Sequence, residues 1–336
     1  MSKIFITLDY ELFFGNNAGT QYNSIIYPTE RLLKILDKNK VKASFFVDSG
    51  YLLKLKEYKN EFPTLEADYE EISGQLRKLS IEGHDLQLHI HPHWEDSYYN
   101  GEKWIMDTSR YRLNSFSAEE IGSIVFRHKK VLEDFAQNEV FVFRAGGWCI
   151  QPFDKIKEAL KTNNIWLDST VFEKGRNKSE THFFDFRKAP SKSIWKFDDN
   201  PVQENAEGYF TELPISSIRV TPYFFWKLAY TKMFGGKKYS GFGDGTAAGG
   251  SKWDKIRMLT QSSNTVISID GYKASLLKKA FKKFKKTDEE QNFVIIGHPK
   301  ALSEFSLKKL EQFFNDSKEN VFLTYSSWVK YKIKAN

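Results

Sequence analysis

The chain has very little of several features that would narrow its class. Cys149 is the only cysteine among 336 residues, so no internal disulfide can staple the fold. No run of about 18 apolar residues is present, which argues against a membrane-spanning helix. The N-terminus enters a strand pattern at Lys3 and has no apolar core or cleavage site typical of a signal peptide. We therefore expect a cytoplasmic protein.

Charge and hydropathy are close to those of an ordinary globular protein. Lys and Arg total 50 and Asp and Glu total 43, which gives a net charge of +7. This mild excess favours anionic partners without naming one, and no nucleic-acid motif is present, so nucleic acid is not expected. Aromatic residues are abundant, with 29 Phe, 16 Tyr and 8 Trp. They suit a phenylalanine-packed core, a sugar-stacking surface, or both.

Strand and helix patterns alternate along most of the chain. Strands are expected at 3–8, 43–47, 85–88, 140–143, 165–167, 265–269, 293–296 and 321–325, and helices at 27–38, 68–79, 117–135, 153–161, 274–285 and 303–314. This alternation predicts an α/β fold of parallel strands with helices outside. It is interrupted by short strands and turns over 183–220. We predict one domain over 1–336 with an insertion near 180–262.

Polar side chains follow several of the predicted strands. They are Asp9 and Glu11, the segment 89–93, Arg144, Asp168 and His298. In a parallel β/α barrel the carboxyl ends of the strands meet at one mouth, where the functional groups gather. The sequence therefore predicts one site built from five strand ends.

The densest of these signals is a histidine cluster. Four of the seven histidines, His84, His89, His91 and His93, fall within ten positions. Neutral imidazole is the commonest metal ligand. His89 and His93 would meet across a helical turn or tight loop, whereas His89 and His91 would share one face of an extended strand. In the metal-site interpretation His84 supports this loop from behind. The plainer alternative is a surface loop that happens to be rich in histidine.

Asp9 and Glu11 form the second signal. In an extended chain they point to the same side. Two neighbouring carboxylates can have different roles, one binding a metal ion and the other accepting protons. Without the histidines, the same pair would be interpreted as a solvated strand end.

Five segments, in this order, make a series that resembles a known family. They are Thr7–Glu11, Gly83–His93, Phe143–Trp148, Leu167–Val171 and Ile295–Pro299. Together they resemble the motifs of the polysaccharide deacetylases, also called the NodB homology or carbohydrate esterase 4 group. The resemblance implies a distorted (β/α) barrel, with the insertion contributing short strands and a glycine-rich loop. It also implies a metal-dependent enzyme that removes an acetyl group, N-acetyl in preference to O-acetyl, from a sugar of a surface polysaccharide or its precursor.

The resemblance also implies roles for individual residues. It makes Asp9 the catalytic base, His298 the general acid, Arg144 the partner of Asp9 and Asp168 the residue that orients the pair. It makes Glu11, His89 and His93 the metal ligands, with His91 as the rival histidine. It places Tyr10, Trp94 and Trp148 at the substrate. One divalent ion is expected, zinc first, and cobalt, nickel or manganese would also suit these ligands.

The sequence departs from the family pattern at several positions. Tyr10 separates Asp9 from Glu11, where two adjacent Asp residues are usual, and Gly146 replaces a usual Pro. His91 stands between the two expected histidine ligands. These departures indicate a divergent branch, for which capsule or O-antigen assembly is one setting.

Two other interpretations stay open. One keeps the fold but cleaves a non-peptide C–N bond in a small cyclic amide. The other is a catalytically silent member that binds glycan or a lipid carrier, although Asp9, Arg144 and His298 are all present, which a pure binder would not need. For the leading interpretation the partner is a carbohydrate, free, nucleotide-linked or lipid-linked.

Three further features lie outside these motifs. Aromatic residues lie beside lysines over 222–238. This suits a helix that rests on an anionic membrane, and the plainer alternative is a helix packed on the barrel. The glycine-rich segment 235–250 could be a lid or a surface loop. Cys149 has no neighbouring pattern of a nucleophile and is interpreted as a small core residue.

Overall fold

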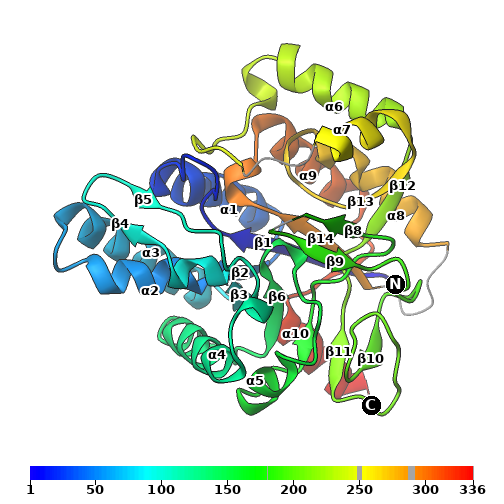
Figure 1. Ribbon diagram of the computed structural model, residues 1–336. Coiled ribbons are helices and arrows are strands. Elements are labelled where there is room, and N and C mark those ends of the chain that lie inside the picture. Colours follow the sequence, from blue (N-terminus) through cyan, green and yellow to red (C-terminus); the bar gives the residue numbers. More distant parts are fainter. Residues whose placement is uncertain (180, 248–251, 287–291, 336) are drawn as a thin grey trace. The chain divides into compact units, whose positions relative to one another are not determined.

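The structure, a computed structural model, describes residues 1–179, 181–247, 252–286 and 292–335 (Figure 1). The chain divides into two compact units. The first unit contains residues 1–41 and 215–323, and the second contains residues 42–214 and 324–336. Compact units need not be separate domains, so the expectation of one domain over 1–336 stays a prediction.

The strands of the first unit are organised around β1 (Lys3–Tyr10). This strand pairs in parallel with β14 (Asn292–Gly297) and with the short β15 (Val321–Phe322). Its side chains are buried almost throughout, as expected for a parallel strand covered on both faces. In the register of β1 and β14, Leu8 lies opposite Gly297. The next residues along the two strands are therefore Asp9 and His298.

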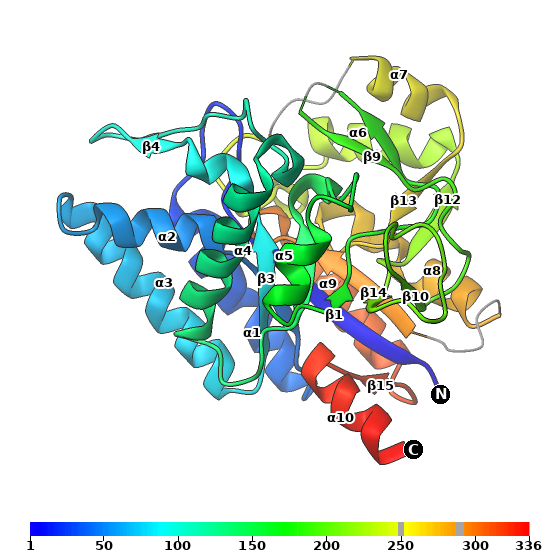
Figure 2. The same cartoon turned by 60° about the horizontal axis from the view of Figure 1, so that its bottom comes forward.

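Helices and one antiparallel pair of strands complete the first unit (Figures 1 and 2). They are α1 (Tyr27–Lys38), α6 (Pro222–Phe234), α7 (Lys252–Thr260), α8 (Leu277–Phe284) and α9 (Glu304–Asp316), with the antiparallel pair β12 (Ser217–Val220) and β13 (Ser263–Val266). In α8, Leu277, Ala280 and Phe281 are buried on one face, so the lysines of this helix face water. Phe281 lies against Phe293 of β14, with ring centroids 5.1 Å apart.

The second unit contains a sheet in the order β10-β11-β7-β6-β3-β2. Its strands are β2 (Ser44–Asp48), β3 (Asp85–Ile90), β6 (Val142–Ala145), β7 (Leu167–Asp168), β10 (Trp195–Phe197) and β11 (Phe210–Glu212). All neighbours are parallel except β10 and β11. The helices are α2 (Ser49–Tyr58), α3 (Pro63–Ile81), α4 (Ala118–Glu133), α5 (Lys157–Thr162) and α10 (Tyr325–Ala335). Two small hairpins pair β4 (Tyr98–Tyr99) with β5 (Trp104–Ile105) and β8 (Arg176–Lys178) with β9 (Phe183–Asp185).

Most elements expected from the sequence are present within a few residues. The short strands expected over 183–220 correspond to β9, β10, β11 and β12. Three helices, α2, α7 and α10, were not expected. α2 begins directly after β2, and α10 begins where the last strand was expected to end, so β15 has only two residues. Among the described residues no helix is long and apolar enough to cross a membrane.

Candidate functional site

In the first unit, the register of β1 and β14 brings three predicted site residues together. The Nε2 atom of His298 lies 3.7 Å from Oδ2 of Asp9 and 3.8 Å from Oε1 of Glu11. Both carboxylates are almost fully buried. Asp9 and Glu11 therefore point to one side of the chain, as their spacing predicted.

The other ring nitrogen of His298 is held by Asp270, which was not anticipated from the sequence. Oδ2 of Asp270 lies 2.8 Å from Nδ1 of His298, and Oδ1 accepts the backbone N–H of His298 at 2.8 Å. Burial by itself lowers the pKa of His298, but the charge and hydrogen bond of Asp270, followed by Asp9 and Glu11, outweigh it and raise the pKa. Burial likewise opposes ionisation of Asp270, but His298 outweighs it and lowers the pKa of that carboxyl. The ring is thus oriented with Nε2 toward the carboxylates.

Lys300 is a second functional candidate that the sequence motifs did not include. It is largely buried, and its Nζ donates to Oε1 of Glu11 at 2.9 Å and to the carbonyl of Leu12 at 2.5 Å. The alkyl stem and ammonium lie beside Phe13 and Phe14, with Nζ 4.9 and 4.8 Å from the two ring centroids. This ion pair fixes one oxygen of the Glu11 carboxylate.

The described part of the glycine-rich segment lies against the same region. The N–H of Gly243 donates to the carbonyl of Lys300, at a position where a Cβ would meet that carbonyl at 2.8 Å. Asp244 accepts hydrogen bonds from the backbone N–H and hydroxyl of Thr20 and from the amide of Asn23. Residues 241–247 are therefore anchored, while 248–250 lie outside the described residues.

In the second unit, the predicted histidines lie at and beyond the end of β3. Nδ1 of His89 lies 2.8 Å from the carbonyl of Arg144, so this nitrogen donates and the tautomer places the lone pair on Nε2. His91 follows the strand, with its ring centroid 4.8 Å from that of His89. His93 lies in the 3₁₀ helix Pro92–Glu95 and stacks on Tyr111, with an interplanar angle of 12°.

A buried polar cluster surrounds Arg144 and Asp168. The Arg144 guanidinium is fully buried and donates to the carbonyl and hydroxyl of Ser169. Asp168 lies directly opposite Glu212 in the parallel pair β7–β11, and both side chains are buried. Burial, and then the charge of Asp168, raise the pKa of Glu212 well above its usual range. The Glu212 carboxyl therefore holds its proton more tightly than an ordinary glutamate does, which favours donation to Asp168.

The three predicted substrate contacts differ in exposure. Trp94 is 1% exposed, and its indole N–H donates to Asp48 at 2.6 Å, which suits a core side chain. Tyr10 is also buried. Trp148 is partly exposed and packs against Phe172. Trp148 is therefore the one of the three that presents appreciable surface.

Cys149 is buried, and burial raises the pKa of its thiol to about 11. A neutral, buried thiol agrees with the interpretation of this residue as part of the core.

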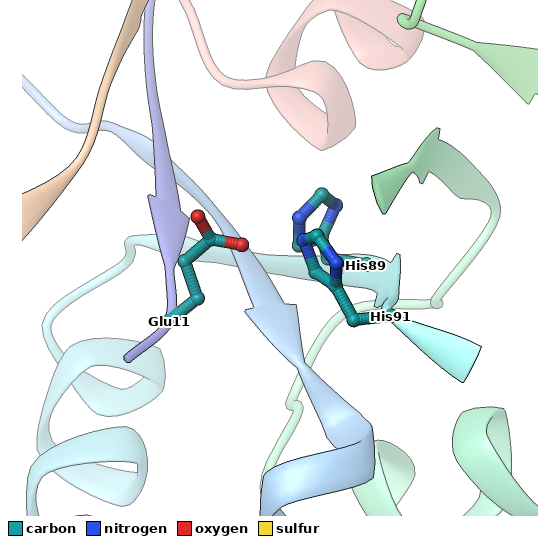
Figure 3. Close-up of side chains that lie close together, drawn as sticks. All are labelled: Glu11, His89 and His91. Carbon is teal, nitrogen blue, oxygen red and sulfur yellow. The ribbon is translucent and has the colours of Figure 1, made fainter. Parts of the chain in front are cut away.

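Among the described residues, Glu11, His89 and His91 form a group that could hold a metal ion (Figure 3). Each offers one ligand atom, and these atoms lie within 4.8 Å of one another. All three side chains are buried. Two imidazoles and a carboxylate match the donor types that zinc accepts, so the residues fit the expected ion. The group contains the rival histidine, His91, and not His93.

Comparisons with known proteins find similarity in structure only. No model of a known protein family matches the sequence, and no curated protein matches it. The fold is similar to that of a candidate polysaccharide deacetylase from Mycobacterium smegmatis, at 16% identity and a TM-score of 0.53. That match covers 99% of this chain and 90% of the other. The expected α/β fold, a distorted (β/α) barrel of the polysaccharide deacetylase type, is therefore confirmed.

Two further solved structures are more distant. The carbohydrate esterase 4 domain of a xylanase from the hindgut metagenome of Trinervitermes trinervoides is 11% identical, with a TM-score of 0.42, and the match covers 98% of this chain and 91% of the other. A mutant with restored activity of a pseudoenzyme of the same family is 10% identical, with a TM-score of 0.43 and coverage of 97% and 66%.

Proposed function

We propose that this protein is a metal-dependent hydrolase that removes an N-acetyl group from a sugar of a surface polysaccharide or its precursor. The observation that carries the proposal is the grouping of Glu11 with His89 and His91, all buried. A second observation supports it, because Asp9 and His298 supply a base and an acid 3.7 Å apart. The resemblance in fold agrees with this assignment but does not name the sugar.

In the proposed site, Glu11, His89 and His91 would hold one divalent ion, with zinc favoured by the donor types. When bound, such an ion polarises the acetyl carbonyl and lowers the pKa of a bound water to about 7. This proposal replaces His93 with His91 as the second histidine ligand. The stacking of His93 on Tyr111 gives it a separate role, as a packed ring beside the site.

The remaining residues would move protons. Asp9 takes the proton of the attacking water, and His298 gives a proton to the departing amine. Asp270 keeps His298 oriented and favours its charged form before transfer. The roles of Arg144 as partner of Asp9 and of Asp168 as an orienting residue rest on the motif resemblance and stay proposals, as does a cytoplasmic location.

Two alternative functions differ from the proposed one in the product that they release. A hydrolase of a cyclic amide would open a ring and release no acetate, whereas a silent binder would hold glycan or lipid carrier without turnover. The base–acid pair Asp9 and His298 favours hydrolysis over silence. Acetate release from N-acetylated and O-acetylated sugars separates the proposed function from both alternatives, and ring opening of a cyclic amide separates the two alternatives from each other.

Metal content tests the proposed ligand set. Wild-type protein, reconstituted with zinc and desalted, is expected to carry about one ion per chain. His89→Ala and His91→Ala should lose that ion, and His93→Ala is the matched control that should retain it. Loss in His89→Ala and His93→Ala, with retention in His91→Ala, would contradict the assignment of His91. No ion in the wild type would contradict the metal-dependent function itself.

A further inference from the structure

Helix α6 presents an apolar face to water. Tyr230, Met233 and Phe234 are 64%, 73% and 67% exposed, and Tyr223 and Trp226 are exposed to a similar degree. Their spacing of three, four and seven residues puts them on one side of the helix. An ordinary surface helix buries its apolar stripe. Here Phe225 is the buried residue, and the larger apolar surface faces outward.

The segment 213–243, which contains α6, has charged residues of a single sign. No acidic residue occurs between Glu212 and Asp244. The same stretch contains five exposed cations, Arg219, Lys227, Lys232, Lys237 and Lys238. None of them forms an ion pair with an acidic side chain within the part of the chain that the structure describes. The face therefore combines exposed aromatic rings with uncompensated positive charge.

The face is supported from within the first unit. Trp226 donates its indole N–H to the carbonyl of Leu259 at 2.9 Å, which joins α6 to α7, where Ile256 is also exposed. On the inner side, Phe224 stacks on Tyr272 with ring centroids 5.7 Å apart. Tyr272 follows Asp270, the partner of His298, by two residues. Figures 1 and 2 both draw α6 and α7 side by side.

We propose that the exposed face of α6, with Ile256 of α7, docks on an anionic membrane surface. Trp and Tyr favour the membrane interface, and Lys and Arg are attracted to anionic headgroups. A second copy of this chain is a poor occupant, because a symmetric contact would bring the same cations together without counter-charges. Docking goes beyond the proposed reaction and does not depend on it. A docked enzyme would suit a sugar carried on a lipid.

Sedimentation with vesicles tests this proposal without any turnover. The full-length protein should sediment with vesicles of phosphatidylcholine and phosphatidylglycerol, and much less with phosphatidylcholine alone, with binding weakened by added salt. Replacing Tyr230, Met233 and Phe234 together by Ser should weaken binding by about tenfold or more. Lys237→Glu with Lys238→Glu should have a similar effect. Trp226 is left in place because it holds α7.

Matched controls lie elsewhere on the surface. Phe126→Ser removes an exposed aromatic ring of α4, and Lys282→Glu with Lys283→Glu reverses two exposed charges of α8. Both control proteins should bind like the wild type. Equal weakening in these controls would overturn the proposal, since it would show attraction by net charge alone. Protein that stays in solution, or dimers that the triple Ser variant abolishes, would also overturn it.

Discussion

At the scale of single residues, three groups of the candidate site are each oriented by a contact to one of their polar atoms. Nδ1 of His89 is held by the carbonyl of Arg144, and Nδ1 of His298 by Asp270. One oxygen of Glu11 is held by Lys300. In both histidines the remaining nitrogen, Nε2, is the atom that the proposed chemistry would use. Such supporting contacts set the orientation of a ligand and its affinity.

The contact between Lys300 and Glu11 gives the first prediction. Lys300→Met keeps most of the alkyl stem but removes the charge that fixes Glu11. Zinc affinity should fall by about 10-fold to 100-fold, as for other supporting residues of metal sites. Competition with a chelating dye measures it. Lys308→Met, on the exposed face of α9, is the control and should leave the affinity unchanged. Unchanged affinity in Lys300→Met would remove Lys300 from the site.

The pair of His298 and Asp270 gives a prediction of pH dependence. Despite burial, Asp270 and then Asp9 and Glu11 raise the pKa of His298, so the acid stays protonated above pH about 6.5. Activity that needs this proton is present below the raised pKa and is lost as pH rises through it. Asp270→Asn removes the largest raising contribution. In the pH profile of kcat/KM, the alkaline limb of Asp270→Asn should therefore lie at lower pH than that of the wild type. A limb at the same pH in both proteins would exclude His298 as the acid.

At the scale of secondary structure, features set by local sequence patterns could be predicted, whereas contacts set by long-range pairing could not. The capping box of α4 was visible as Ser117 followed by Glu120, and the structure contains both hydrogen bonds. The strand β1 was visible as an apolar run. By contrast, Asp270 could not be assigned to His298, because the two are 28 residues apart and meet only when β14 is in place.

The capping box gives a prediction for stability. Ser117→Ala leaves the N–H of Glu120 without its cap, which should lower the free energy of unfolding by about 1 kcal/mol. Urea unfolding followed by circular dichroism measures this change. Ser123→Ala, at an exposed position inside the same helix, should change stability by less than about 0.5 kcal/mol. Equal effects in the two variants would show that the cap contributes nothing.

The pairing of β7 with β11 gives a second prediction for stability. A Glu212 that is protonated and donates to Asp168 can be replaced by Gln, whose amide also donates. Glu212→Gln should therefore unfold near the wild-type urea concentration, while Glu212→Ala leaves a buried carboxylate without that donor and should cost about 1–3 kcal/mol. Glu212→Gln as destabilising as Glu212→Ala would mean that Glu212 is ionised.

At the scale of the whole molecule, the order of the five motif segments along the chain predicted more about the fold than any single motif did. Five segments after successive strands predicted an α/β barrel with one site, and the fold agrees with that expectation. Which of His91 and His93 groups with Glu11 and His89 could not be predicted from spacing. It depends on the chain leaving β3 at Ile90, which keeps His91 near His89 and turns His93 into the 3₁₀ helix.

Acetate release by zinc-loaded protein tests the central claim most directly. Protein given an N-acetylated amino-sugar oligomer should release acetate, lose that activity on chelation and regain it when zinc is restored. Asp9→Asn should lower the rate by about 100-fold or more while the zinc content stays near one per chain. Metal-independent release, or no release from any N-acetylated or O-acetylated sugar by fully loaded protein, would contradict the account.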